Sequence, residues 1–368
     1  MARLLFVTGT PADVRSGSGT FVGISVLKAA LEGAGHRVDL LAPSPGRPTL
    51  SPARRLLFNL AIRRRASQIA RGADAVVGFD LDGAFLARGG APHVAALKGV
   101  LAEEARFERG AAALRLGAQA AVERLHVRRA DRVLATSTHS ARCIVEDYGI
   151  PAERIRIVPE PIDLARWAAL LGAPTPDSGK DSILCVAHLY PRKNVATLLE
   201  AFARTETDAV LRIVGTGPEE GALRRRVSVG DLGGRVELLG HVPLESLAAE
   251  YRRARIFCLP SRQEGFGIVF LEAMAAGLPI VAARAAAVPE VVLDGECGML
   301  VPPEDVSALS DALRTLLSDA ALRRRLGEGG LRRVRGYDAV KVAARFLDAL
   351  GIGEKGSGMP VSSPRDSA

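Results

Sequence analysis

The chain has 368 residues, of which 48% are hydrophobic and 4% aromatic, and its formal net charge is +8 at pH 7. This length is greater than a single hydrophobic core usually supports, and it is sufficient for two domains of ordinary size. The shortage of aromatic residues favours a layered α/β interior of Leu, Val, Ile and Ala, and the charge favours anionic partners. No apolar run approaches the ~20 residues of a membrane-spanning helix.

The N-terminus and the cysteines both favour a cytoplasmic protein. The first residues, MARLLFVTGT, pass directly into an apolar strand and lack the long apolar stretch and cleavage site of a signal peptide. The cysteines are widely separated, without CxxC or Cys/His spacing, so we expect reduced core residues rather than disulfides or metal ligands. They are Cys143, Cys185, Cys258 and Cys297.

In the first half of the chain, short apolar runs alternate with stretches of helical periodicity, which predicts strands separated by helices. A Gly/Ser-rich turn at Ser16–Gly19 follows the first strand, and residues 20–32 carry apolar side chains at helical spacing. The predicted strands cover residues 3–8, 37–42, 74–79, 93–97, 131–136 and 154–159.

A segment rich in Gly, Pro and Ser at residues 171–182 interrupts this alternation and predicts a linker. The alternation then restarts, and residues 305–350 are helical throughout in their pattern. The predicted strands of this half cover residues 182–187, 210–215, 235–240, 255–260, 279–283 and 298–301.

This alternation predicts two doubly wound parallel sheets in tandem, with right-handed crossovers and helices on both faces. Ligands of such sheets bind outside the carboxyl ends of the strands, so the cleft between the two domains is the expected site. The expected parts are an N-terminal domain at 1–170, the linker at 171–182, a second domain at 183–335, a helix at 336–351 that crosses back to the first domain, and a disordered tail at 352–368.

Three glycine-bearing turns follow predicted strands and are candidates for phosphate contacts. Glycine lets the backbone approach a ligand, and a following helix directs free N–H groups at an anion. None gives the full GxGxxG pattern and the chain has no Walker-type GK[ST], so dinucleotide and P-loop sites are disfavoured, while plain loops remain an alternative. The turn residues are Gly17, Ser18 and Gly19, then Gly215 and Gly217, then Gly265, Phe266 and Gly267.

Charged residues follow two strands of the second half. Arg192 and Lys193 lie between a strand end and a helix predicted from about Val195, where they could neutralise a diphosphate or form a solvated basic pair. Glu264 lies on a loop and Glu272 about one turn inside the next helix, so their carboxylates should be ~10 Å apart. That separation is too large for one metal ion or for a retaining hydrolase pair, and it suits a long ligand held at two places.

Two segments of the second half closely resemble the signature of retaining nucleotide-sugar glycosyltransferases of the glycogen-synthase-like type: PSRQEGFGIVFLEAMAAGLPIVA and VPEVVLDGECGMLVPPED. This family is the glycosyl transferases group 1, with the GT-B fold. Further segments fit it in order: RLHVRRADRVLATS, YGIPAERIRIVPEPID, YPRKNVATLLEAF and RVELLGHVP. The resemblance implies two Rossmann-like domains facing a cleft, an N-terminal acceptor domain and a C-terminal donor domain. It also implies transfer of a hexose from a UDP- or GDP-sugar to a hydroxyl acceptor with retention.

The resemblance also implies roles for individual residues. Glu264 would contact the donor hexose, Glu272 the ribose hydroxyls, and Lys193 with Arg192 the diphosphate, so the expected catalytic residues are Lys193, Arg192 and Glu264. No cofactor or metal is implied, because Lys193 and the helix N-terminus would stabilise the departing diphosphate. The remaining donor-binding positions are the three glycine turns with His188, His241 and Ile268.

The chain departs from the family pattern at several positions. Ala187-His188 replaces the usual Gly-Arg, Lys98 replaces a histidine that commonly ends the strand, and PEP replaces PNG at residues 159–161. Lys98 and Asp82 are candidates for contacts to the acceptor or the transferred sugar. The departures leave two alternatives open: a nucleotide-sugar epimerase, and a catalytically weak nucleotide-sugar-binding protein.

Weaker signals concern other ligands. Asp80-Leu81-Asp82 matches the DxD metal pattern of a different glycosyltransferase fold, but it lies in the half opposite the donor site. Residues 53–71 are basic with an apolar side, which predicts peripheral association with an anionic membrane at its inner face, or a plain surface helix. No nucleic-acid partner is expected, because recognised modules and interleaved aromatics are lacking. His126, His139 and Met274 are expected to be structural.

Overall fold

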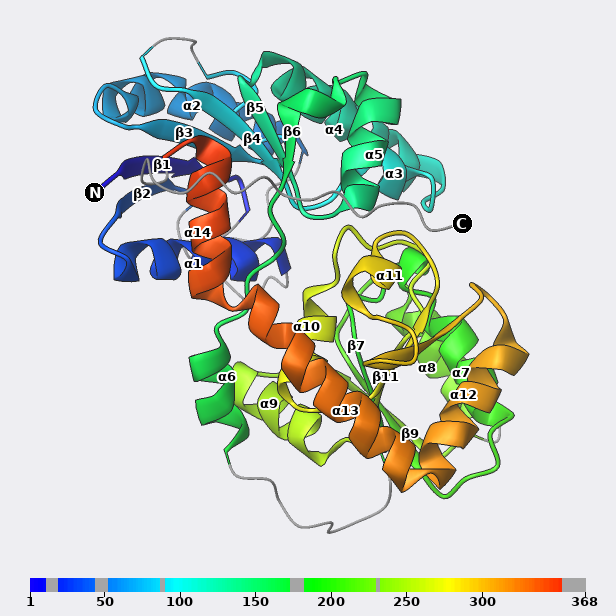
Figure 1. Ribbon diagram of the computed structural model, residues 1–368. Helices are drawn as coiled ribbons and strands as arrows, with labels where there is room; N and C mark the ends of the chain where they lie inside the picture. The colour runs from blue at the N-terminus through cyan, green and yellow to red at the C-terminus, as the bar shows by residue number, and fades with distance from the viewer. Residues whose placement is uncertain (11–18, 44–51, 87–89, 173–181, 230–231, 353–368) are drawn as a thin grey trace, which may run out of the picture.

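The computed structural model describes residues 1–10, 19–43, 52–86, 90–172, 182–229 and 232–352. It contains two parallel six-stranded sheets with helices packed on their faces (Figure 1). The predicted two-domain α/β architecture is therefore confirmed. The glycine turn residues Gly17 and Ser18, most of the predicted linker, and all of the predicted tail after residue 352 lie outside the described residues.

The N-terminal sheet has the strand order β2-β1-β3-β4-β5-β6. Its strands β3 and β4 are buried along their whole length, as expected for parallel strands covered on both faces. The winding reverses between β1 and β3, which makes their carboxyl ends a topological switch point. The strands are β1 (Arg3–Val7), β2 (Arg37–Leu41), β3 (Ala75–Phe79), β4 (His93–Leu97), β5 (Arg132–Ala135) and β6 (Ile155–Ile157).

The C-terminal sheet has the order β12-β11-β10-β7-β8-β9, and its winding reverses between β7 and β10. The apolar strands of this sheet form one core with the helices around it. The strands are β7 (Ser182–Val186), β8 (Val210–Val214), β9 (Val236–Gly240), β10 (Ile256–Leu259), β11 (Ile280–Ala283) and β12 (Gly298–Val301).

The helices of the first half follow its strands, and capping residues mark where a helix begins and ends, as α5 shows. At the start of α5 the Ser137 side chain accepts a hydrogen bond from the Ser140 N–H, and at its end Gly149 adopts the left-handed conformation with φ of 68°. The helices are α1 (Gly19–Gly33), α2 (Pro52–Ala70), α3 (Leu101–Ala105), α4 (Gly110–Arg129), α5 (Thr138–Tyr148) and α6 (Leu164–Leu171).

The helices of the second half include one correction to the sequence prediction. Residues 305–350 are not helical throughout, because Asp319 and Asp338 begin new helices: the Asp319 side chain accepts from the N–H of Leu322, and that of Asp338 from the N–H of Val340. The helices are α7 (Val195–Ala203), α8 (Glu220–Val229), α9 (Leu244–Arg253), α10 (Ile268–Ala275), α11 (Val288–Val291), α12 (Val306–Ser318), α13 (Ala320–Val334) and α14 (Ala339–Leu350).

The C-terminal helices return to the first half of the molecule. Helix α13 lies along the C-terminal sheet, and α14 continues from it to pack beside α1 (Figure 1). Phe346 of α14 is buried and meets Phe6 of β1 edge-on, with ring centroids 5.8 Å apart. The last helix is therefore part of the N-terminal core.

Candidate functional site

The switch point of the C-terminal sheet brings together the two loops that the sequence singled out. Strands β7 and β10 are adjacent and parallel, so their carboxyl ends meet at one edge of the sheet. Strand β7 leads through η3 (Pro191–Lys193), a short 3-10 helix, into α7, and β10 leads through residues 260–267 into α10. Ligands of doubly wound sheets bind at this place.

Lys193 and Glu264 meet directly at this edge. The Lys193 ammonium donates a hydrogen bond of 2.6 Å to Oε1 of Glu264, and the Ser261 hydroxyl donates to the same oxygen at 2.8 Å. The Lys193 and Glu264 side chains are 13% and 7% exposed. Their charges are mostly shielded from water, so an anion beside Lys193 would interact strongly with it.

Arg192 points toward the other half of the molecule. Its Nε donates to Oε1 of Gln263 at 3.0 Å, and its guanidinium lies 3.3 Å from Glu104 of α3. The guanidinium also stacks 4.9 Å from the Tyr190 ring centroid. These contacts place Arg192 between the two halves, so its predicted role at a diphosphate remains a prediction.

The glycine turn before α10 fits closely against the N-terminal half. The Gly265 carbonyl accepts hydrogen bonds from three hydroxyls, and a Cβ on Gly265 would lie 2.8 Å from the Lys98 carbonyl oxygen. Gly267 has φ of 89°, and a Cβ there would lie 2.5 Å from the Phe270 ring, so both positions require glycine. The hydroxyl donors are Thr136 at 3.0 Å, Ser137 at 2.8 Å and Ser140 at 3.1 Å.

Of two other predicted donor residues, one lies inside this turn and one directly after it. Phe266 is buried, and its ring packs edge-on against Tyr337 with centroids 5.5 Å apart. Ile268 begins α10, and a Cβ on Gly19, the first residue of α1, would lie 3.8 Å from the Ile268 side chain. The start of α1 therefore lies next to the start of α10.

Glu272 lies one turn inside α10 and is nearly buried. Its Oε2 accepts a hydrogen bond of 2.8 Å from the Tyr251 hydroxyl. Burial raises the pKa of Glu272 to about 7, and the hydrogen bond from Tyr251 partly opposes this rise. The carboxylate is held in one position, which suits a residue that binds hydroxyl groups.

The glycines after β8 have a packing role. Gly215 has φ of 130°, and a Cβ there would lie 1.8 Å from the Ala187 carbonyl oxygen; a Cβ on Gly217 would lie 2.7 Å from the Leu189 backbone. The loops after β7 and β8 can approach this closely only because both residues lack a side chain. Burial lowers the pKa of His188 between these loops, which favours neutral imidazole, whereas His241 is exposed beyond β9.

Lys98 lies at the end of β4 and is paired within the first half. Its ammonium donates to Oε2 of Glu160 at 2.9 Å and lies 5.6 Å from the centroid of the Phe79 ring. The Lys98 and Glu160 side chains are 10% and 7% exposed. Two of the three departures from the family pattern, Lys98 and the Glu160 of PEP, therefore form one ion pair.

Asp82 is a framework residue. It is fully buried, and its carboxylate accepts from the Gly9 N–H at 2.5 Å, from Arg55 at 2.6 Å and from Asn59 at 2.8 Å. These contacts join the turn after β1 to α2 and to the chain after β3. In this arrangement Arg55 and Asn59 surround the carboxylate, which the spacing of residues could not show, and its contact to an acceptor or a transferred sugar remains a prediction.

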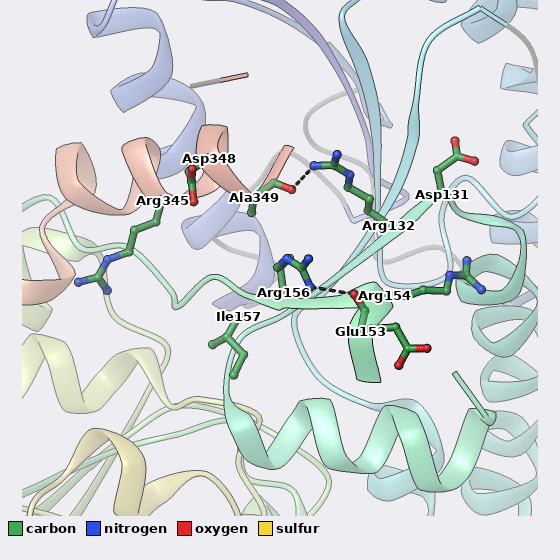
Figure 2. Close-up of a pocket in the computed structure, with 9 residues that line it drawn as sticks. All are labelled: Asp131, Arg132, Glu153, Arg154, Arg156, Ile157, Arg345, Asp348 and Ala349. Atoms are coloured by element: carbon green, nitrogen blue, oxygen red, sulfur yellow. Dashed lines mark hydrogen bonds between the residues drawn. The ribbon is translucent and has the colours of Figure 1, made fainter. Parts of the chain in front are cut away.

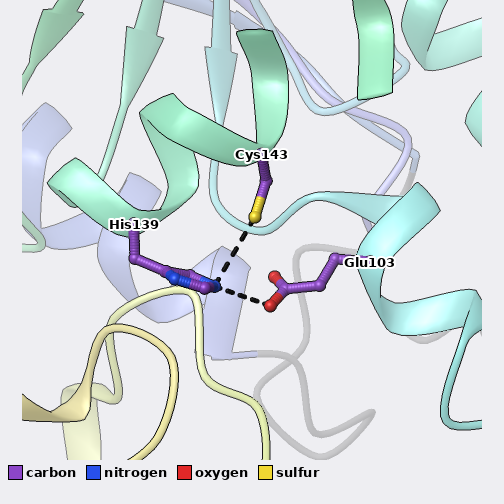
Figure 3. Close-up of side chains that lie close together, drawn as sticks. All are labelled: Glu103, His139 and Cys143. Atoms are coloured by element: carbon purple, nitrogen blue, oxygen red, sulfur yellow. Dashed lines mark hydrogen bonds and ion pairs between the residues drawn. The ribbon is translucent and has the colours of Figure 1, made fainter. Parts of the chain in front are cut away.

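A second set of residues lies where the two halves meet, and of these the sequence singled out only His139, as a structural residue. Glu103 of α3 accepts from Nε2 of Gln263 at 2.9 Å and contacts His139 of α5 at 2.6 Å (Figure 3). The Glu290 carboxylate of the second half accepts from the backbone N–H groups of Thr138 and His139. These partners are more than 30 positions apart in the sequence, so no local motif could indicate them.

A cavity of about 480 Å³ lies away from these loops, at the amino end of β5 (Figure 2). Arginines from β5, from the region of β6 and from α14 surround it, together with three carboxylates. Its charged lining residues are Arg132, Arg154, Arg156, Arg345, Asp131, Glu153 and Asp348. None of them was a predicted site residue.

Two family models match the chain. The model of glycosyl transferases group 1 matches residues 172–333, and that of glycosyltransferase family 4 matches residues 17–166. The first match contains β7 to β12 and the Lys193–Glu264 contact.

The chain is also similar to curated proteins and to solved structures. MMP alpha-(1->4)-mannosyltransferase of Mycolicibacterium hassiacum is 36% identical over 225 residues, which are 60% of this chain and 54% of that protein. Phosphatidyl-myo-inositol mannosyltransferase of Mycobacterium leprae is 40% identical over 176 residues, which are 47% of this chain and 46% of that protein. The chain thus spans about half the length of these relatives. Sucrose-phosphate synthase from Thermosynechococcus elongatus has the same fold, with a TM-score of 0.78 at 23% identity over 95% of this chain and 98% of that one.

Proposed function

Because the chain belongs to the glycosyl transferases group 1, we propose that it is a retaining hexosyltransferase. It moves a hexose from a UDP- or GDP-sugar to a hydroxyl group of a glycan, lipid or small molecule. The two relatives named above are mannosyltransferases, which favours a hexose donor. The observation that carries the proposal is the Lys193–Glu264 contact at the switch point of the C-terminal sheet.

Lys193 stabilises the leaving group in this proposal. Negative charge develops on the nucleoside diphosphate as its bond to the hexose breaks, and a fixed cation beside that charge lowers the barrier. Lys193 is 13% exposed and held by Glu264, so it needs little rearrangement before the reaction. The first turn of α10 directs free N–H groups to the same region.

The two glutamates bind different parts of the donor in this proposal. Lys193 and Ser261 both contact Oε1 of Glu264, and we assign the other oxygen, Oε2, to the hexose hydroxyls. Glu272, fixed by Tyr251, binds the ribose hydroxyls. A departing phosphate oxygen takes the proton of the acceptor hydroxyl, so no protein nucleophile is needed. No metal or other cofactor is required for transfer, because Lys193 and α10 supply the positive charge.

We also propose that α2 places the enzyme on an anionic membrane. Three leucines on one side of this helix are exposed, Leu56 by 43%, Leu57 by 63% and Leu60 by 49%. The exposed Arg54 precedes them on the same helix, and this combination of apolar and basic groups suits a membrane surface. Among the described residues no helix is both long and apolar enough to cross a bilayer.

The test begins with a thermal-shift screen of UDP- and GDP-sugars against the purified chain, since a ligand that binds the folded state raises the melting temperature. The best donor is then incubated with hydroxyl acceptors, and the anomeric configuration of the product is read by NMR. Transfer with retention supports the proposal. Conversion of the donor without an acceptor would indicate an epimerase, and binding without transfer or slow hydrolysis would indicate a binding protein.

A further inference from the structure

Three side chains of metal-ligand type converge next to the donor loops. Glu103 lies on α3, and His139 and Cys143 lie on the same face of α5, four residues apart (Figure 3). Nε2 of His139 is 2.6 Å from Oε1 of Glu103 and 3.5 Å from the Cys143 sulfur. The three potential ligand atoms all lie within 4.8 Å of one another.

The neighbours of this cluster hold it in place. Glu290 of the second half accepts from the Thr138 and His139 N–H groups at 2.7 and 2.6 Å, which fixes the start of α5. Gln263 donates to Oε2 of Glu103 at 2.9 Å and so directs the other oxygen, Oε1, toward His139. Outer contacts of this kind orient the ligands of metal sites.

A nucleophilic relay does not explain the geometry. In a nucleophile–base–acid relay, the acid and the nucleophile bind different nitrogens of the imidazole. Here Glu103 and Cys143 both approach Nε2 of His139. An oxygen, a nitrogen and a sulfur therefore converge within 4.8 Å of one another, and a cation between them would contact all three.

We propose that Glu103, His139 and Cys143 bind a divalent transition-metal ion of the zinc class. Zinc takes thiolate, imidazole and carboxylate ligands, and its tetrahedral bond lengths put sulfur and nitrogen ligands roughly 3.5 Å apart. The sulfur–nitrogen distance is already 3.5 Å, whereas the 2.6 Å contact between Glu103 and His139 must open to roughly 3.4 Å. The thiol makes magnesium and calcium poor occupants.

Metal binding would release protons from the ligands and would oxidise or reduce no group. The Cys143 thiol releases a proton to solvent, and His139 binds through Nε2 as the neutral imidazole with its proton on Nδ1, so that an imidazolium would also release one proton. The ion accepts three electron pairs without a change of oxidation state. Three protein ligands leave a fourth position for water or another molecule. Glu103 keeps its Gln263 contact through Oε2, so the ion is linked to the loop that carries Glu264. None of the three ligands belongs to the proposed donor site, so metal binding can be tested independently of transfer.

The experiment titrates the full chain, reduced and freed of metal with a chelator, with Co²⁺ as a spectroscopic probe of the zinc site. We expect one Co²⁺ per chain, a near-ultraviolet charge-transfer band from cobalt–thiolate bonding, and displacement by Zn²⁺. Cys143→Ser should abolish the charge-transfer band. Cys297→Ala, which removes another buried free thiol, should leave it unchanged.

Two further variants keep the proposal testable if Cys143→Ser fails to fold. His139→Gln should lose Co²⁺ binding, and Gln263→Ala should keep the thiolate band but weaken binding about tenfold to a hundredfold, since Gln263 only orients Glu103. Absence of Co²⁺ binding to the intact chain would overturn the proposal. So would a cobalt spectrum without the thiolate band, or one that survives both Cys143→Ser and His139→Gln.

Discussion

The two halves of the molecule use the charged groups at their sheet switch points differently. In the C-terminal half, Lys193 and Glu264 pair with each other where β7 and β10 end, and their side chains are 13% and 7% exposed. In the N-terminal half, Asp82 follows β3 in the same topological position, yet it is fully buried and held by Arg55 and Asn59. Equivalent positions of two similar sheets can therefore keep a charged pair close to the surface or bury a charge that holds loops together.

Loss of Asp82 should have the largest effect on stability. Asp82→Ala leaves Arg55 without its buried partner, and breaking a buried ion pair costs about 3–5 kcal/mol of unfolding free energy. Urea unfolding should show a lower midpoint at constant slope. Asp311→Ala removes the exposed pair with Arg314 and should cost no more than about 1 kcal/mol. If both variants lose the same free energy of unfolding, the buried charge of Asp82 does not hold the N-terminal half together as proposed.

Loss of Lys193 should have the largest effect on catalysis. Lys193→Ala should lower kcat more than it raises the donor KM, with an increase of about 2–4 kcal/mol in the barrier, because its charge is needed most by the departing diphosphate. Steady-state kinetics at varied donor concentration measure both kcat and the donor KM. Lys341→Ala, an exposed lysine of α14, serves as the control and should leave both unchanged. A change confined to KM would show that Lys193 only binds.

Glu123 of α4 should make stability depend on pH. Burial raises the pKa of Glu123 from 4.5 to about 8, although a hydrogen bond from Tyr148 acts to lower it. The folded state then keeps a proton that the unfolded state releases, so stability should fall as pH rises through the window from 4.5 to about 8. Glu123→Gln should reduce this slope in thermal unfolding, and Glu146→Gln, on the exposed side of α5, should not. If the stability of the unmutated chain and of both variants depends on pH to the same extent, this dependence does not come from Glu123.

Chelation should have the smallest effect on transfer. EDTA should leave the transfer rate unchanged, because Lys193 and the start of α10 are proposed to neutralise the diphosphate without a metal. Initial rates with and without EDTA measure this directly. Loss of activity, restored by magnesium or manganese, would show that the C-terminal half needs an ion as well as its own charges.

The sequence was sufficient to predict the strands and the two loops that carry Lys193 and Glu264, but not the ion pair between these residues. Each predicted strand corresponds to a strand of the structure, because strands buried on both faces are continuous apolar runs. Lys193 and Glu264 are 71 positions apart, but the rule that ligands bind at a switch point brings their loops to one edge. The breaks at Asp319 and Asp338 were missed, because helical periodicity continues on both sides of each cap.

Contacts between the two halves could not be predicted from the sequence. Gln263 and Glu103 are 160 positions apart, and Gly265 and Ser137 are 128 apart. Such contacts depend on how two separately folded sheets pack together, and no local periodicity describes that packing. The cluster around His139 lies within the first half, but it could not be predicted either, because its side chains come from two helices and the cysteine spacing alone indicated an ordinary core residue.

The central claim is that Glu264 binds the hexose and Glu272 the ribose, and calorimetry with two ligands tests it most directly. Glu272→Ala should weaken both the intact donor and the free nucleoside diphosphate, since both contain the ribose. Glu264→Ala should weaken the donor and leave the free diphosphate nearly unchanged. A charge-assisted hydrogen bond contributes roughly 1.5–3 kcal/mol, so each loss should be about tenfold to a hundredfold in affinity. Equal weakening of the free diphosphate by both folded variants would contradict the assignment.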